Sequence, residues 1–196
     1  RDITEKYGAV LIFDEVITGF RLSDGGAQKY YGITPDMTTL GKIVGGGMPL
    51  AVYGGKREIM ECVAPLGSVY QAGTLSGNPC AVAAGIAQLK LIESTPDLYS
   101  RIDSGAEKLH NAYLESGLNA NRCGSLLTVF FTDGEVTDYD AAVKCDTAKF
   151  AEYWRHMLGC GIYAAPSQFE AMFVSYAHSD EDIERTVLAI RTFRQK

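Results

Sequence analysis

The stretch AVLIFDE, residues 9–15, constrains the fold most, because five apolar residues in a row are followed directly by two carboxylates. A continuous apolar run of this kind is typical of a strand that is buried on both faces of a parallel sheet. Such a strand needs neighbours, and only two or three similar strands follow. We therefore expect this chain to be the C-terminal part of a longer protein.

Strand and helix patterns alternate along the rest of the sequence. Besides residues 9–13, strands are predicted at 37–41, 49–55, 126–132, 161–166 and 172–177. Helices are predicted at 56–63, 79–93, from 98 to a stop at Gly117, at 146–158 and after a capping pair at Ser179 and Asp182. Asn78 or Ser76 would cap the helix at 79–93, whose nearly all-round apolar surface predicts burial. This alternation predicts an α/β fold with one domain at 1–95 and a smaller α/β domain at 96–196.

Composition excludes several classes of function. A net charge of −6 argues against nucleic acid or an anionic membrane as the main partner, and no apolar run approaches the length of a membrane span. The five cysteines are odd in number and widely spaced, and the three histidines lie far apart. The sequence therefore predicts free thiols in a reducing compartment, without a disulfide framework or a metal site.

Three features carry candidate chemistry. Asp14 ends the first strand, where ligands of open α/β sheets bind, although it could equally cap a loop. Lys42 follows the strand at 37–41 and precedes three glycines, where a shielded lysine could form a Schiff base, although a surface lysine in a turn is the simpler reading. The loop QAGTLSGNP, residues 71–79, offers amides and hydroxyls to a phosphate, although it could be only a capped helix start.

Together these features match the requirements of a pyridoxal phosphate site. A carboxylate keeps the pyridine nitrogen of the cofactor protonated, so that the ring can act as an electron sink. A lysine holds the aldehyde and then moves protons as a general base.

Longer motifs give the sequence a family likeness. LIFDEVITGFR, DMTTLGKIVGGGMPLAVYGG, VYQAGTLSGNP and AAPSQFEAMFVSYAHSDEDI resemble the glutamate-1-semialdehyde 2,1-aminomutase family, a branch of the class III aminotransferases of fold type I. The likeness implies that 1–95 is the C-terminal part of a large cofactor-binding domain with a mostly parallel, incomplete sheet and a long interdomain helix. It also implies that the N-terminal half is missing and that this chain alone is inactive.

The resemblance assigns roles to particular residues. It implies that Lys42 binds pyridoxal phosphate covalently, that Asp14 pairs with the pyridinium nitrogen and that Val16 packs on the ring. Gly73 and Thr74 would bind the cofactor phosphate of the other subunit of a homodimer. From the small domain, Glu170 would lie near the site.

The implied reaction is an intramolecular amino transfer. It converts (S)-4-amino-5-oxopentanoate to 5-aminolevulinate for porphyrin (tetrapyrrole) synthesis, with the cofactor passing between its pyridoxal and pyridoxamine forms. The expected location is the cytoplasm, or the plastid stroma in a photosynthetic eukaryote. Within this resemblance, class III aminotransferases that act on α-amino acids often carry an arginine in the C-terminal region, and its absence between Arg155 and Arg185 favours the aminomutase. One alternative is an ω-aminotransferase of the same class. The other is a non-catalytic α/β module in which Lys42 and Asp14 are structural.

Overall fold

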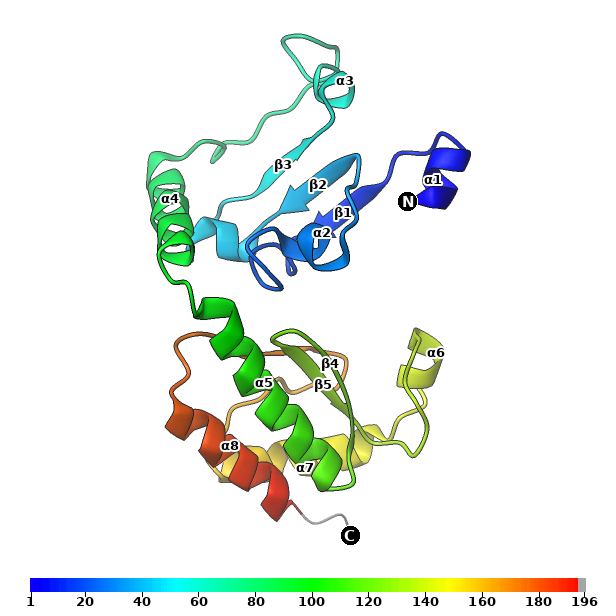
Figure 1. Ribbon diagram of the computed structural model, residues 1–196, viewed down its shortest axis with the longest axis vertical. Helices are drawn as coiled ribbons and strands as arrows, with labels where there is room; N and C mark the ends of the chain where they lie inside the picture. Colours follow the sequence, from blue (N-terminus) through cyan, green and yellow to red (C-terminus); the bar gives the residue numbers. More distant parts are fainter. Residues whose placement is uncertain (194–196) are drawn as a thin grey trace. The chain divides into compact units, whose positions relative to one another are not determined.

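The computed structural model describes residues 1–193 of the chain (Figure 1). The chain divides into two compact units, with the boundary between Pro96 and Asp97. Each unit combines helices with one small three-stranded sheet, which confirms the predicted α/β class. None of the helices in the described part of the chain is long and apolar enough to cross a membrane.

The sheet of the first unit consists of β1 (Ile12–Glu15), β2 (Met37–Leu40) and β3 (Val52–Gly55), in that order. β1 and β2 run parallel, whereas β2 and β3 run antiparallel, so only one of the two strand pairs has the predicted parallel direction. β1 begins three residues later than predicted and includes both carboxylates. Asp14 lies opposite Thr39, which in turn lies opposite Tyr53, so these three side chains share one face of the sheet.

Helices surround this sheet at its ends. They are α1 (Asp2–Lys6), α2 (Gly26–Tyr31), the 3₁₀ helix η1 (Lys42–Gly45), α3 (Arg57–Met60) and α4 (Pro79–Glu93). α4 begins and ends where the sequence predicts. The Asn78 side chain accepts hydrogen bonds from the amides of Cys80 and Ala81 at 3.0 and 3.2 Å, and Pro79 occupies the first turn. Asn78, and not Ser76, is therefore the cap.

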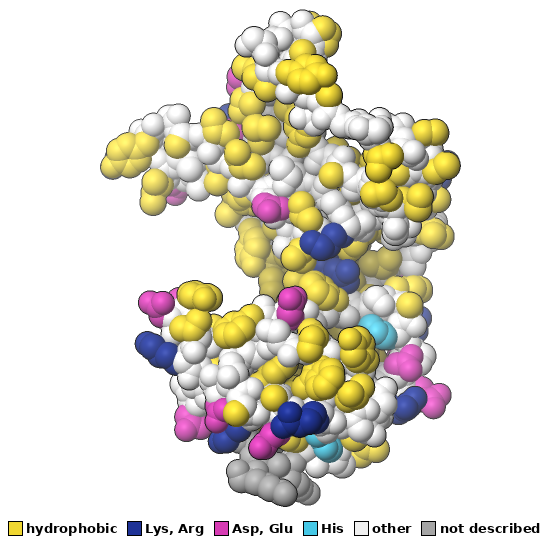
Figure 2. All heavy atoms as spheres, turned by 180° about the vertical axis from the view of Figure 1, so that it is seen from behind, with side chains coloured by type: hydrophobic (Ala, Val, Ile, Leu, Met, Phe, Trp, Pro, Cys, Tyr) yellow, Lys and Arg dark blue, Asp and Glu magenta, His cyan; other side chains and the backbone are white. Residues whose placement is uncertain are grey.

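Two burial predictions for this unit are not met within residues 1–193. Val10 and Ile12 are 54% and 55% exposed, because within residues 1–193 β1 pairs with β2 alone. On α4, Ile86 and Leu91 are 50% and 62% exposed. Figure 2 accordingly shows hydrophobic side chains on the surface over α4 and around α3.

α4 packs closely against η1 around Gly85. A Cβ added to Gly85 would lie 2.6 Å from the backbone oxygen of Val44, and one added to Gly46 would lie 2.7 Å from that of Ala84. The two backbones therefore approach within a distance that only glycine permits. This contact positions α4 beside the segment that carries Lys42.

The second unit is built around a larger core. Its elements are α5 (Leu98–Glu115), β4 (Asn119–Cys123), β5 (Leu126–Phe130), α6 (Tyr139–Ala142), α7 (Thr147–Gly159), β6 (Met172–Phe173) and α8 (Asp180–Thr192). The antiparallel sheet β4–β5–β6 packs with α5, α7 and α8 around buried residues such as Ile102, Leu127, Tyr153 and Ile190 (Figure 1). α5 ends before Gly117, whose φ of 73° confirms the predicted stop.

Predictions for the last third of the chain have mixed outcomes. Ser179 and Asp182 form the predicted capping box at the start of α8. The strand predicted at 172–177 contains only Met172 and Phe173, and 161–166 forms no strand. In that segment the carbonyl of Ala164 accepts a hydrogen bond from the indole of Trp154 at 2.9 Å. The donor to this backbone carbonyl is therefore a side chain and not the amide of a neighbouring strand.

Candidate functional site

Asp14 and Lys42 lie at the same edge of the first sheet. Asp14 is the third residue of β1, and Lys42 follows the end of β2 by two residues. Since β1 and β2 are adjacent and parallel, their carboxyl ends meet at one edge, which is where open α/β sheets bind ligands. Both side chains are exposed to solvent. The two residues selected from the sequence are therefore brought to the same part of the fold.

The carboxylate of Asp14 is held by its neighbours. Its Oδ1 accepts a hydrogen bond from the amide of Val16 at 3.1 Å and from the hydroxyl of Thr39 at 3.2 Å. One carboxylate oxygen is thus fixed by β1 and β2 together, while acceptor capacity remains for a further donor. Thr39 is a site residue that the sequence analysis missed, and its pairing partner in the sheet could not be known from the sequence.

The backbone at Lys42 adopts an unusual conformation. Its φ is +48°, in the left-handed region that residues other than glycine rarely enter. Gly41 precedes it, and a Cβ on Gly41 would lie 3.1 Å from Cγ1 of Val16. The side chain of Val16 therefore lies directly against the backbone that presents Lys42. Local strain of this kind costs about 1–3 kcal/mol and is concentrated at functional sites.

A cavity of about 670 Å³ adjoins this edge. Its lining includes Val16 and Thr39 from the strand edge, Tyr53 from β3, and Gly73 and Ser76 from the loop before α4. Gly73 and Thr74 are both exposed, but only Gly73 is part of the lining. Asp14 and Lys42 are not part of the lining either. The cavity thus brings Val16 together with the glycine-rich loop, beside the strand edge that bears the two charged residues.

Glu15 differs sharply from Asp14 although it is the next residue. Its side chain is 1% exposed, and its two carboxylate oxygens accept hydrogen bonds from Thr18, Ala27 and Gln28. Because successive side chains of a strand point to opposite faces, Glu15 lies on the face away from Asp14. From the sequence alone, Glu15 had no predicted role.

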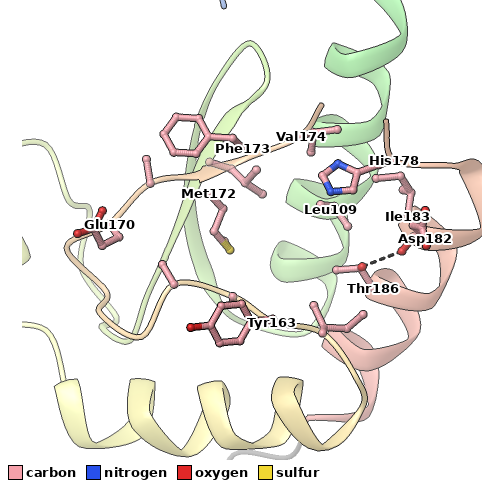
Figure 3. Close-up of a pocket in the computed structure, with 15 residues that line it drawn as sticks. Leu109, Tyr163, Glu170, Met172, Phe173, Val174, His178, Asp182, Ile183 and Thr186 are labelled. Carbon is pink, nitrogen blue, oxygen red and sulfur yellow. Dashed lines mark hydrogen bonds between the residues drawn. The ribbon is translucent and has the colours of Figure 1, made fainter. Parts of the chain in front are cut away.

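Glu170 belongs to the second unit and lies in a different pocket. This pocket has a volume of about 390 Å³ and is lined mainly by apolar residues such as Leu109, Met172 and Ile183. Figure 3 shows Glu170 at one end of the pocket, in the loop before β6, and His178 at the other end near the start of α8. The structure therefore does not bring Glu170 together with the other predicted site residues within one unit.

Comparisons with known proteins agree with the likeness seen in the sequence. Curated glutamate-1-semialdehyde 2,1-aminomutases from Pelotomaculum thermopropionicum and Persephonella marina are 55% and 57% identical, over 97% and 95% of this chain. A crystal structure of a β-phenylalanine aminotransferase from Variovorax paradoxus is 32% identical over 98% of the chain, with a TM-score of 0.88. In each case the chain spans 45% of the length of the relative.

A family match covers most of the sequence. Residues 1–182 match the class-III aminotransferase family; this range covers the first unit, most of the second unit and every candidate site residue named above. On this evidence the chain belongs to the class-III aminotransferases.

Proposed function

We propose that the complete protein containing this chain is a pyridoxal phosphate-dependent glutamate-1-semialdehyde 2,1-aminomutase. The observation that carries the proposal is the position of Asp14 and Lys42 at the carboxyl edge of two adjacent parallel strands. The choice of substrate is supported by relatives of that name, which are about half identical over almost the whole chain.

The residues at the strand edge fit this cofactor. The hydrogen bonds from Val16 and Thr39 orient the carboxylate of Asp14 and leave it able to accept from the pyridine nitrogen. Gly41 lets the backbone pass close to Val16, whose branched side chain would pack on one face of the ring. Lys42 presents an exposed amine from a fixed, left-handed backbone position.

The chemistry divides between the cofactor and the chain. When bound, pyridoxal phosphate supplies an electron sink for cleavage of the bond between hydrogen and the carbon that bears the amine. The Nζ of Lys42 would hold the cofactor and then take and return the proton at that carbon, as a general base and acid. Asp14 would keep the pyridine nitrogen protonated. Substrate and product are isomers, so no second amino acid is consumed.

A second copy of the chain is part of the proposal. The loop before α4 exposes large apolar side chains: Leu66 at 78%, Tyr70 at 83% and Leu75 at 58%. We infer that a homodimer covers them and that Gly73 and Thr74 contribute their amides, and Thr74 its hydroxyl, to the phosphate of the cofactor in the other subunit. The first 95 residues would then be part of a large cofactor-binding domain and 96–196 a small domain.

Two further assignments complete the proposal. Glu170 would approach the substrate from the small domain. All five cysteines are free thiols, as in proteins of a reducing compartment, so we extend the proposal to a cytoplasmic location.

An aminotransferase acting on two separate substrates is the second candidate. The similarity of fold to the β-phenylalanine aminotransferase favours it, because the residues at the carboxyl edge of β1 and β2 could hold the cofactor in both reactions. The difference in identity, 55% against 32%, favours the aminomutase. Turnover decides between them: the complete protein should form 5-aminolevulinate without an added amino acceptor, whereas an aminotransferase requires one. The chain of residues 1–196 alone should form none.

Lys42 itself is tested by reduction with borohydride. The complete protein is loaded with pyridoxal phosphate, reduced and digested, and its peptides are weighed. The cofactor should be attached to the peptide that contains Lys42 in the wild type and in Lys29→Ala, a control at an exposed lysine of the same unit. Lys42→Arg should carry none. Attachment to a different lysine in the wild type would overturn the assignment.

A further inference from the structure

Glu15 is the most deeply buried carboxyl group beside the candidate site. It is 1% exposed, and four donors point at it. The amide of Ala27 donates at 2.6 Å, the hydroxyl of Thr18 at 3.1 Å, and the backbone and side-chain amides of Gln28 at 3.2 and 3.0 Å. Burial of a carboxylate is costly unless its oxygens are satisfied in this way. A Cβ on Gly26 would collide with this carboxylate, so the chain is shaped to receive it.

These contacts join β1 to β2 on the face away from Asp14. The side-chain amide of Gln28 donates to Glu15 and also to the hydroxyl of Thr38, at 3.0 Å in both cases. Thr38 immediately precedes Thr39, the residue that donates to Asp14. The two faces of the same strand pair therefore carry matched links: Glu15–Gln28–Thr38 on one face and Asp14–Thr39 on the other.

Glu15 also fixes the turn that follows it. Its backbone oxygen accepts from the amide of Gly19 at 2.9 Å, while its side chain accepts from Thr18. Within this turn the amide of Val16 donates to Asp14. Displacement of the Glu15 side chain would thus release the turn, and with it the amide that orients the carboxylate of Asp14.

We propose that Glu15 is a positioning residue, which sets the orientation of Asp14 and Val16 toward the cofactor through the turn at 16–19 and through Gln28. This inference rests on the proposed function, because it requires Asp14 to bind the cofactor. Glu15 itself would not touch the cofactor, since it lies on the opposite face of β1. A side chain that only stabilised the fold would change the free energy of unfolding but leave the spectrum of the bound cofactor as it is.

The test compares three variants of the complete protein. Glu15→Gln keeps the size of the side chain but sets an amide against the amide donors of α2. Asp14→Asn tests the proposed function directly. Asp24→Asn is the matched control, an exposed carboxyl in the connection between β1 and α2 that pairs with Lys29. For each, the dissociation constant for pyridoxal phosphate is measured by absorption titration, together with the pH midpoint of the absorption band of the bound cofactor.

Glu15→Gln is expected to weaken cofactor binding about tenfold, since small misplacements of orienting groups have effects of about 10–100-fold. It should also move the pH midpoint in the same direction as Asp14→Asn, while Asp24→Asn matches the wild type. If Asp14→Asn changes both measurements and Glu15→Gln changes neither, the positioning role is wrong and the proposed function stands. If Asp14→Asn changes neither, the role of Asp14 in the proposed function fails.

A second variant covers the case in which Glu15→Gln does not fold. Gln28→Leu removes the side-chain donor to Glu15 and Thr38 and leaves the carboxylate with its other three donors. We expect a smaller effect of the same kind, about threefold on the dissociation constant, with the same direction of the pH midpoint. Unchanged values of both in Gln28→Leu would overturn the proposal.

Discussion

The buried tyrosine pair of the second unit allows the sharpest prediction about stability. The hydroxyls of Tyr113 and Tyr153 lie 2.5 Å apart, and the two side chains are 1% and 0% exposed. Tyr113 also reaches the sulfur of Met172 at 3.8 Å. If Tyr153 donates to Tyr113 and Tyr113 donates to Met172, both hydroxyl hydrogens are used. Substitution by phenylalanine removes a hydroxyl and leaves each ring in place.

The two single variants should differ in cost. Tyr113→Phe leaves the Tyr153 hydroxyl buried without its one hydrogen-bond partner among residues 1–193, which should lower the free energy of unfolding by about 1–3 kcal/mol. Tyr153→Phe leaves Tyr113 with its weak sulfur acceptor and should cost about 1 kcal/mol. The double variant removes both polar groups and should cost about 1 kcal/mol or less. The pair is therefore predicted to couple by about 1–2 kcal/mol.

The chain supplies its own probe for this double-mutant cycle. Trp154, the one tryptophan of the sequence, lies in α7 within the same core, so its fluorescence during urea unfolding reports on this unit. Tyr139→Phe is the matched control, because Tyr139 is 74% exposed, and should change the free energy by less than about 0.5 kcal/mol. Costs that simply add in the double variant would refute the hydrogen-bond argument.

The same pair predicts a loss of stability in alkaline solution. Burial raises the pKa of Tyr153 to about 12 and raises that of Tyr113 well above its ordinary value. Unfolded tyrosine loses its proton near pH 10, so the unfolded state binds fewer protons above that pH. The contribution of the tyrosine pair to stability should be constant below about pH 10 and fall between about pH 10 and 12, by up to about 1.4 kcal/mol per pH unit for each tyrosine. Tyr153→Phe should reduce this slope of unfolding free energy against pH, and an unchanged slope would contradict the assignment.

Two predictions concern the first unit. Gly46 and Gly47 both have positive φ, but a Cβ on Gly46 would lie 2.7 Å from the backbone of Ala84, whereas a Cβ on Gly47 would meet open space. Gly46→Ala should therefore lower the free energy of unfolding of this unit by about 1 kcal/mol more than Gly47→Ala, as measured by urea unfolding followed by circular dichroism. Equal costs would show that backbone strain alone matters. The carboxylate of Asp36 accepts a hydrogen bond from the amide of Leu11 at 2.7 Å, and a hydrogen bond from Lys56 holds the pKa of Asp36 well below its ordinary value. The stabilisation from Asp36 should therefore be present at neutral pH and be lost in acid. Hydrogen exchange at the Leu11 amide should quicken in Asp36→Asn at pH 7, and an unchanged rate would contradict this.

The long helices of this chain were predictable because their start signals are local, whereas the short helices α2 and α6 were not predicted. Asn78 before Pro79, and Ser179 three residues before Asp182, mark helix starts through contacts within one turn, and both are confirmed. β4 was missed because its sequence, NANRC, is polar, and it becomes a strand only through pairing with β5. The exposure of α4 could not be predicted from the sequence either, because an apolar helix surface does not identify the segment that packs against it.

The candidate site shows the same limit at the scale of two residues. Asp14 and Glu15 are adjacent carboxylates, and the period of two in a strand places them on opposite faces whichever face is buried. The position of two adjacent carboxylates at a strand end therefore predicts that one of them faces a ligand, but it does not identify which one. The choice depends on α2, because its first amides and Gln28 enclose Glu15 and leave Asp14 to solvent and Thr39. These donors lie 12 and more residues away in the sequence, so the division of roles between the two carboxylates is a property of the folded chain.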